Sequence, residues 1–290
     1  MNLALKKIRS VIAKSIPFSI RRLLPINIIQ HLYFSGSFTA FLYGKPVVKF
    51  ISKGYQIENE IYWRGIEGCH EGRSMQVFSE ILSIIKPQVI WDIGANSGTY
   101  GVLAKALNKN SQVFFFEPIP KAAEMVRENL FLNGFDAKVF QVALGDYDGD
   151  GQIYFGKGED FATSVTVNKN TLENDQLSVS LSILVRRADS LMKQYSIPFP
   201  NLVKLDVETY EFEVLNGFGI KDFEECIFLI EILSDDLATK VSSFFSKSEY
   251  DYYNIDDKNM SVRKTQNLEK SDFYNYLICP KSLSSQLKII

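Results

Sequence analysis

The stretch VIWDIGANSGTYGVLAKALNKNSQVFFFE (residues 89–117) decides the fold class of this 290-residue chain. It opens on a short apolar run of the kind that forms a strand buried in a parallel sheet. A glycine loop follows, and residues 99–107 then place apolar side chains at helical spacing. A second apolar run closes the stretch at Glu117. Strand, helix and strand in this order predict a parallel sheet.

The same alternation continues from residue 76 towards the end of the chain. Pro120 stands where a helix would begin, and Asn133-Gly134 stands where it would stop. Five further core strands are predicted, from the runs AKVFQVAL, NLVKLD, CIFLIEIL, YDYYNID and NYLICP. We therefore expect a doubly wound, Rossmann-like α/β fold with a seven-stranded, mostly parallel sheet.

Two segments lie outside this pattern. Residues 1–75 contain no repeated unit, although FTAFLYGKPVVKFI (38–51) predicts two strands with a turn near Gly44. We expect residues 1–75 to form an extension and residues 76–290 to form the α/β domain. Residues 157–175 are polar and lie between the strand candidates GQIYFG and LSVSLSILV, which indicates a surface excursion able to cover a site.

The glycine loop, with Gly94, Asn96 and Gly98, predicts a ligand site. A loop between a strand and a helix presents backbone N–H groups, and glycine lets a ligand approach closely. Glu117 ends the next strand, 19 residues after Gly98, where a carboxylate can accept hydrogen bonds from ribose hydroxyls. A nicotinamide dehydrogenase would use the same features, but asparagine here replaces the first glycine of its fingerprint. Tight strand–helix packing is the other explanation for the glycines.

Four stretches resemble successive motifs of the FkbM family of methyltransferases, namely VIWDIGANSGTYGVLAK, VFFFEPIPKAAEMVRENLFLNGF, VALGDYDGDG and LVKLDVETYEFEVLNGF. The resemblance runs from about residue 60 to about residue 279. It implies a class I methyltransferase fold, S-adenosylmethionine as cofactor, and O-methylation of sugars, polyketides or similar products.

The resemblance also implies cofactor roles for particular residues. By motif match these are Asp92, Gly94, Asn96 and Gly98 at the methionine moiety, with Asp92 near its amino group, and Glu117 at the ribose. Many members read aspartate-valine-glutamate-glycine in the fourth motif, whereas this chain has threonine in place of the glycine, at Thr209. Without that glycine the backbone is less free, which puts the acceptor site in doubt.

Methyl transfer to a hydroxyl calls for a base or a metal, because a neutral hydroxyl is a poor nucleophile. Asp206 and Glu208 are two apart at a strand end, so they share one face if the strand continues. His70 is a third candidate, and Glu231 at the end of the next strand is a fourth. The acid pair could equally hold Mg²⁺ or stabilise a helix N-terminus, but no further ligand cluster is evident and we expect no metal site.

Aromatic residues are frequent at 13% of the chain, and several are expected near the mouth of the site. Such rings can stack on a sugar or seal a pocket, although most aromatics belong to the core. The candidates are Tyr154, Phe155, Phe161, Tyr210 and Phe212.

The charge distribution separates the first 57 residues from the remainder. They hold nine Lys or Arg and no acid, whereas the rest of the chain holds 23 basic and 34 acidic residues. The basic leader is typical of either peripheral contact with an anionic membrane, through residues 1–30, or a solvated arm. The acidic remainder argues against nucleic acid as the acceptor.

The chain lacks a run long enough to cross a bilayer or a signal-peptide cleavage site, and its three cysteines form no paired motif. We expect a cytoplasmic protein, either free or at the inner face of a membrane. The predicted function is O-methylation of a saccharide or related metabolite. The two rival interpretations are a nicotinamide-dependent oxidoreductase and a non-catalytic membrane-docking protein that keeps the fold.

Overall fold

The computed structural model describes residues 11–29, 32, 34–156, 177–220, 223 and 225–287. Its largest sheet has eight strands in the order β12-β11-β13-β10-β9-β3-β4-β5. These are β3 (Val89–Ile93), β4 (Gln112–Phe116), β5 (Lys138–Phe140), β9 (Leu202–Leu205), β10 (Ile227–Glu231), β11 (Tyr250–Asp256), β12 (Ser261–Thr265) and β13 (Asn275–Pro280).

The chain winds outwards in two directions from the centre of this sheet. Strands β5, β4, β3, β9 and β10 pair in parallel, whereas β13 is antiparallel to β10 and β11. The order runs outwards from β3 through β4 to β5, then returns to β9 on the other side of β3. This confirms the doubly wound, mostly parallel fold, and it puts the switch of direction, where such sheets bind ligands, between β3 and β9.

The prediction of seven strands was one short. β12 was not predicted because its sequence, SVRKT, is polar. It lies at the edge of the large sheet, and every residue in it is exposed or half-buried. The run AKVFQVAL was also taken as one strand, but it breaks into β5 in the large sheet and β6 (Ala143–Leu144) in a second sheet. An apolar run cannot show which sheet each half joins.

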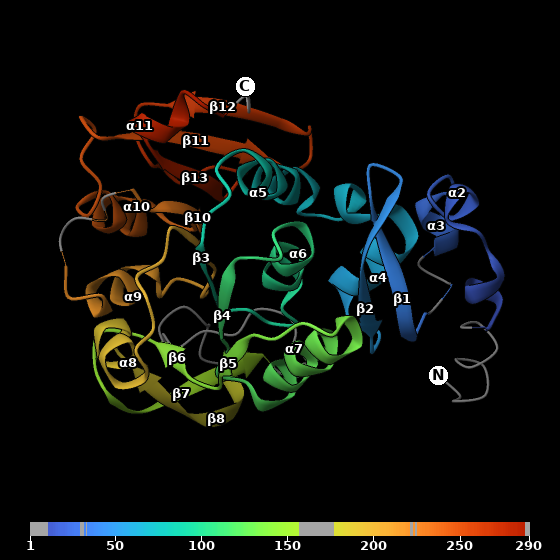
Figure 1. Ribbon diagram of the computed structural model, residues 1–290, viewed down its shortest axis with the longest axis horizontal. Coiled ribbons are helices and arrows are strands. Elements are labelled where there is room, and N and C mark those ends of the chain that lie inside the picture. The colour runs from blue at the N-terminus through green and yellow to red at the C-terminus, as the bar shows by residue number, and fades with distance from the viewer. Residues whose placement is uncertain are drawn as a thin grey trace.

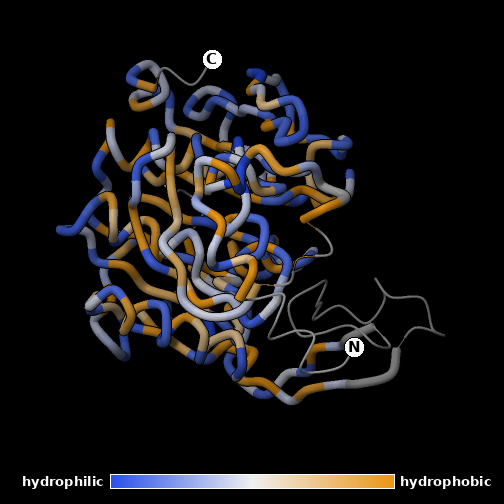
Figure 2. The backbone as a smooth tube through the Cα atoms, turned by 90° about the vertical axis from the view of Figure 1, so that its right-hand side faces the viewer, coloured by the Kyte–Doolittle hydropathy of each residue, from blue (hydrophilic) through white to orange (hydrophobic). Residues whose placement is uncertain are grey.

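Helices cover both faces of the large sheet, seen nearly edge-on in Figure 1. One face carries α5 (Gly72–Ile84), α6 (Thr99–Leu107) and α7 (Pro120–Asn133), and the other carries α8 (Ala188–Tyr195), α9 (Glu211–Gly217) and α10 (Asp235–Ser242). Side chains of β3 alternate between the two cores, with Ile90 in one and Trp91 in the other. Figure 2 accordingly shows hydrophobic colour along the central strands.

A smaller sheet in the order β6-β8-β7 lies beyond β5. It contains β7 (Gly149–Gly156) and β8 (Leu177–Arg186), which pair antiparallel as a long hairpin. The expected excursion at residues 157–175 falls between them and lies outside the described residues.

The N-terminal part contains the predicted pair of strands, β1 (Gly36–Leu42) and β2 (Lys45–Ser52), joined at Tyr43 and Gly44. It also contains α2 (Phe18–Arg21), α3 (Ile26–Ile29), α4 (Gln56–Arg64) and a 3₁₀ turn (Ile66–Gly68), while α11 (Lys281–Ser284) follows β13. Asn133 of α7 ties β2 to the α/β domain, because its amide bonds the N–H and C=O of Lys49 at 2.9 and 2.7 Å. The division at residue 75 stays a prediction.

Within the described part of the chain, no helix is both long and apolar enough to span a membrane.

Candidate active site

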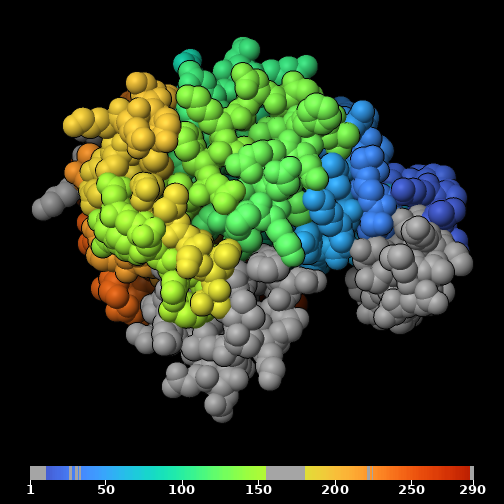
Figure 3. Space-filling view, turned by 90° about the horizontal axis from the view of Figure 1, so that it is seen from below, coloured from blue at the N-terminus to red at the C-terminus, as the bar shows by residue number. Residues whose placement is uncertain are grey.

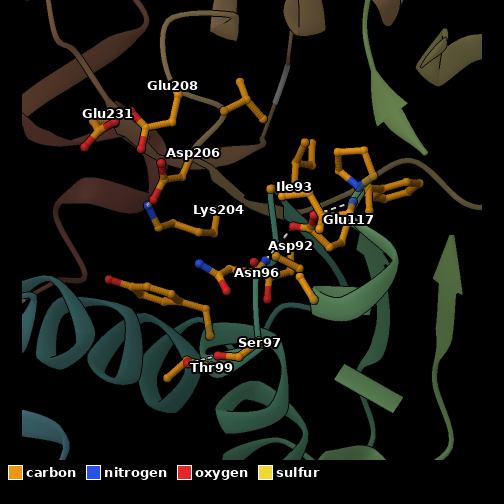
Figure 4. A pocket seen from close by; sticks show the side chains of 18 of the residues that line it. Asp92, Ile93, Asn96, Ser97, Thr99, Glu117, Lys204, Asp206, Glu208 and Glu231 are labelled. Carbon is orange, nitrogen blue, oxygen red and sulfur yellow. Dashed lines mark hydrogen bonds and ion pairs between the residues drawn. The ribbon is translucent and has the colours of Figure 1, made fainter. Parts of the chain in front are cut away.

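A cavity of about 320 Å³ lies where β3, β4, β9 and β10 end. Seven of the eight predicted site residues line it, and these are Asp92, Gly94, Asn96, Glu117, His70, Asp206 and Glu208. Glu231 lines it too, whereas Gly98 does not. Figure 4 shows Glu117 and Asp92 towards one end, and Asp206, Glu208 and Glu231 towards the other. The cavity therefore joins the two groups of residues that the sequence singled out separately.

The loop after β3 takes a left-handed backbone at three positions, with φ of 72° at Gly94, 50° at Asn96 and 80° at Gly98. Gly94 has no room for a side chain, because a Cβ there would lie 1.8 Å from the carbonyl oxygen of Asp206. Gly98 sits behind the cavity wall, at the start of α6, where its missing side chain makes room for Val126. The glycines thus serve both tight packing and a turn whose backbone lines the cavity.

Glu117 lies at the end of the cavity that is predicted to bind the cofactor, here called the cofactor end; the opposite end, with Lys204 and Asp206, is called the acceptor end. The Glu117 carboxylate is 4% exposed and accepts the backbone N–H of Asn96 and of Ile119, each at 2.8 Å. Burial raises the pKa of Glu117 to about 7, against the effect of these two hydrogen bonds. Each carboxylate oxygen can accept two hydrogen bonds, so lone pairs are left for a ligand in the cavity.

Asp92, at the end of β3, fixes the first turn of α6. Its Oδ2 accepts the backbone N–H of Gly101 at 2.8 Å, and the side chain is 2% exposed. Burial raises the pKa of Asp92 to about 7. This hydrogen bond gives Asp92 a structural role at the N-terminus of α6, in addition to the cofactor contact that the sequence predicts.

Lys204 was not singled out from the sequence, and it organises the other end of the cavity. It lies in β9, is 2% exposed, and its Nζ donates to Oδ2 of Asp206 at 3.0 Å. The same Nζ lies 5.1 Å from the centre of the Tyr100 ring. Burial disfavours the ammonium, but the carboxylates of Asp206, Glu71 and Glu231 outweigh burial and raise its pKa. Lys204 is thus a fixed positive charge among acids.

Glu71 is a second residue that the sequence analysis missed. It precedes α5, and its Oε2 accepts the hydroxyl of Tyr100 at 2.8 Å. Burial raises the pKa of Glu71, while the charge of Lys204 acts in the opposite direction. Lys204 is buried and the Glu71 side chain is only 14% exposed, and proteins tolerate ionisable groups in such positions when they are paired.

Glu208 reaches the cavity by a route other than the predicted one. β9 ends at Leu205, so Asp206 and Glu208 do not share a face of a continuing strand. Instead the chain turns through left-handed conformations at Glu208, with φ of 54°, and at Thr209, with φ of 77°. The second is rare for a β-branched residue, and it falls where the motif that this stretch resembles has glycine. The backbone therefore keeps the glycine shape despite the threonine.

The acid pair precedes α9, whose first turn holds two other acids, Glu211 and Glu213. Glu211 is fully buried in the first turn of α9 and accepts the N–H of Val207 at 3.2 Å. Burial raises its pKa to about 8. Asp206 and Glu208 are left facing the cavity.

The pKa values of two other base candidates, His70 and Glu231, are raised. His70 Nδ1 lies 2.8 Å from Oε2 of Glu60, and this hydrogen bond raises the pKa of His70. Burial, followed by the charge of Asp206, raises the pKa of Glu231 to about 10. A carboxyl group with a pKa of about 10 keeps its proton at neutral pH and is a poor general base, which argues against Glu231.

The aromatic lining differs from the expected one. Tyr210 lines the cavity as predicted, but Phe212 packs on Phe244 with ring centroids 5.7 Å apart. The Tyr154 hydroxyl donates to Gln152 at 3.1 Å, outside the cavity wall. Phe161 and the side chain of Phe155 lie outside the described residues. The rings found instead are Tyr55, Tyr100, Phe116 and Tyr274.

No group of three or more His, Cys, Asp or Glu suited to a metal ion occurs among the residues that the structure describes.

Residues 92–257 match the model of the Methyltransferase FkbM domain. This protein belongs to the FkbM methyltransferase family. The matched range contains Asp92, Glu117 and Asp206, whereas His70 precedes it. The family resemblance expected from the four motifs is thereby confirmed.

Two curated relatives of this FkbM protein are methyltransferases by name. 2-O-methyltransferase NoeI of Sinorhizobium fredii is 31% identical over 156 residues, which cover 50% of this chain and 63% of the relative. Hexuronic acid methyltransferase AglP of Haloferax volcanii is 31% identical over 129 residues, which cover 44% and 49%. The aligned part of the chain thus spans about half to three-fifths of each relative.

Among solved structures, the SAM-dependent methyltransferase from Agrobacterium tumefaciens aligns with 85% of this chain and 71% of its own at 9% identity, with a TM-score of 0.43. A likeness this distant says nothing about activity.

Proposed function

We propose that this FkbM protein transfers a methyl group from S-adenosylmethionine to a hydroxyl of a saccharide or related metabolite. The observation that carries the proposal is one cavity with the Glu117 anchor at one end and the Lys204–Asp206 pair at the other. Family membership supports methyl transfer, and the names of both relatives support a sugar-type acceptor.

The residues at the cofactor end fit S-adenosylmethionine. Its ribose has two hydroxyls, and Glu117 retains carboxylate lone pairs after binding Asn96 and Ile119. The backbone of Gly94 and Asn96 lines the same end, and Asp92 adds a buried carboxylate that suits a ligand with a positive charge.

When bound, S-adenosylmethionine would supply the methyl group: its carbon–sulfur bond breaks as a carbon–oxygen bond forms, and the hydroxyl proton passes to a base. We assign that base to Asp206. Lys204 donates to Oδ2 of Asp206, and we assign Oδ1 to the acceptor hydroxyl. Lys204 acts through Asp206 as a positioning residue. Glu208, on the same wall, is placed to accept a hydrogen bond from another acceptor hydroxyl.

We also propose a reducing, cytoplasmic environment. Cys69, Cys226 and Cys279 are all buried and free, so the fold makes no use of an oxidising compartment.

Calorimetric titration with S-adenosylmethionine, S-adenosylhomocysteine and NAD in parallel tests the cofactor class. We expect the first two to bind and NAD not to bind. Methyl transfer from labelled S-adenosylmethionine to neutral and acidic saccharides then tests the acceptor class. Binding of NAD alone would replace the proposal with an oxidoreductase, and binding of no cofactor would replace it with a non-catalytic protein.

A further inference from the structure

The segment 11–29, here called the N-terminal arm, is fastened to the protein along one side. Ala13 is fully buried and its carbonyl accepts the hydroxyl of Tyr62, while Phe18 stacks on Phe41 with centroids 4.1 Å apart. Arg21 is 8% exposed, and its guanidinium lies 3.8 Å from the centre of the Tyr62 ring. Ile29 is buried, and Ile16 and Leu24 pack against the same core, so these contacts fix the arm on the protein.

The exposed part of the arm is rich in large apolar side chains. Among the described residues, 15 large hydrophobic side chains are classed as exposed, and five of them fall within this short arm. They are Val11 (68% exposed), Ile12 (48%), Ile20 (51%), Leu23 (75%) and Ile28 (44%). Apolar side chains are normally scattered singly over a surface, and a concentration of this kind marks an interaction surface.

The arm and the hairpin of β1 and β2 also carry positive charge. Lys14 and Arg22 are exposed between the apolar residues, and Lys45 and Lys49 are exposed on the adjacent hairpin. No acidic residue occurs before Glu58. Figure 3 shows the arm in dark blue at one end of the molecule, beyond the hairpin. Apolar side chains interspersed with Lys and Arg are the pattern of elements that lie in the headgroup region of an anionic bilayer.

We propose that the N-terminal arm docks this protein on an anionic membrane surface. Val11, Ile12, Ile20 and Leu23 enter the boundary between headgroups and acyl chains, and Lys14 and Arg22 meet lipid phosphates. The inference is independent of the proposed methyl transfer, because the surface lies on a different part of the chain from the cavity wall. Each basic residue contributes about fivefold to the affinity for an anionic surface.

Co-sedimentation of the full chain with vesicles tests this docking. The vesicles are phosphatidylcholine alone and phosphatidylcholine with about one-third phosphatidylglycerol. We expect binding to the anionic vesicles only, weakening as salt rises from about 0.1 M to about 0.5 M. Equal binding to both vesicles, or to neither, would overturn the proposal.

Variants separate the surface from general effects. The double change Ile20→Asp with Leu23→Asp is expected to weaken anionic vesicle binding at least about tenfold, because it removes apolar insertion and adds negative charge. Lys14→Ala with Arg22→Ala should weaken it by a similar factor. The matched controls are Leu184→Asp, a 44% exposed position on β8, and Lys193→Ala with Lys258→Ala, at exposed positions elsewhere.

Unchanged thermal unfolding of every variant shows that the fold is intact, since all the altered side chains are exposed. Equal losses in the arm variants and the controls would contradict the assignment. Sedimentation velocity provides the remaining test: a dimer that disappears with the Ile20→Asp and Leu23→Asp change would assign the surface to a second copy of the chain and overturn membrane docking.

Discussion

The two ends of the cavity are shaped by different parts of the chain, one by the backbone and the other by side chains. At the cofactor end, backbone conformation sets the shape: Gly94 and Gly98 supply left-handed turns, and Glu117 holds backbone N–H groups. At the acceptor end, side chains set the shape: Lys204 and Asp206 pair, and non-glycine residues occupy the left-handed turn. The shape of the cofactor end therefore depends mainly on the loop after β3. The acceptor end forms only when elements distant in sequence fold together.

The largest effect is expected from Asp206→Asn, which removes the proposed base. Methyl transfer should fall about 10²- to 10⁴-fold, because general base catalysis typically contributes that much. Cofactor affinity should stay within about threefold of the parent value, because Asp206 belongs to the acceptor end. Rate measurements with labelled S-adenosylmethionine check this.

Asp236→Asn is the matched control for that prediction, because its side chain is 76% exposed and pairs with Lys240. It should leave the rate unchanged. An Asp206→Asn protein with full activity would move the base to Glu208.

Lys204→Met should lower the free energy of unfolding by about 3 kcal/mol, since removing one partner of a buried ion pair leaves the other charge uncompensated. Denaturant unfolding measures the change. Lys240→Met serves as the control, because it breaks an exposed ion pair, and no measurable change is expected there. If both variants unfold alike, Lys204 is not the structural centre of the acceptor end.

Glu231→Gln should stabilise the protein increasingly as pH rises. Burial raises the folded pKa of Glu231 to about 10 from its ordinary value of 4.5, so the folded state binds its proton more tightly than the unfolded state. Its contribution to stability is full below the unfolded pKa and is lost as pH rises towards the folded pKa. Glutamine has no proton to lose.

Between about pH 5.5 and about pH 8, the advantage of Glu231→Gln should grow by about 2 kcal/mol, less than the uncoupled limit because Asp206 and Lys204 readjust. Denaturant unfolding at both pH values measures it. A difference that stays constant with pH would mean that Glu231 is ionised in the folded protein.

The smallest effect concerns the left-handed turn at the acceptor end. Thr209→Gly should stabilise the protein by about 1 kcal/mol, because a β-branched residue at φ of 77° is strained. The Thr209 hydroxyl is also buried without a hydrogen-bond partner, and glycine removes it. Thr239→Gly, inside α10, is the control and should destabilise by about 1 kcal/mol. Thermal unfolding that shows both variants losing stability would argue against strain at Thr209.

Features of the cofactor end could be predicted from the sequence, whereas Lys204 at the acceptor end could not. Local signals were sufficient for β3, α6 and β4, for the turn around Asn96 and for Glu117, because each depends on neighbouring residues. Lys204 was missed because a single lysine within the run LVKL looks like an outward-facing position. Asp206 is a near neighbour in sequence, but Tyr100, Glu71 and Glu231 reach Lys204 only through folding, and together they make its burial possible.

Other differences have the same origin in tertiary structure. The polar edge strand β12 has no apolar signal, and it forms because β11 offers an unpaired edge. The missing family glycine pointed to an unusual backbone at Thr209. The sequence could not show whether the backbone would differ there or whether threonine would adopt a strained left-handed conformation, because packing decides between the two.

Calorimetric titration of S-adenosylmethionine into the parent protein, Glu117→Ala and Asp206→Asn tests most directly whether the cavity has separate cofactor and acceptor ends. We predict that Glu117→Ala weakens binding about ten- to a hundredfold, through lost hydrogen bonds to ribose and a loosened Asn96, while Asp206→Asn binds as the parent does. Equal binding by all three proteins, or equal weakening in both variants, would contradict the division of the cavity into a cofactor end and an acceptor end.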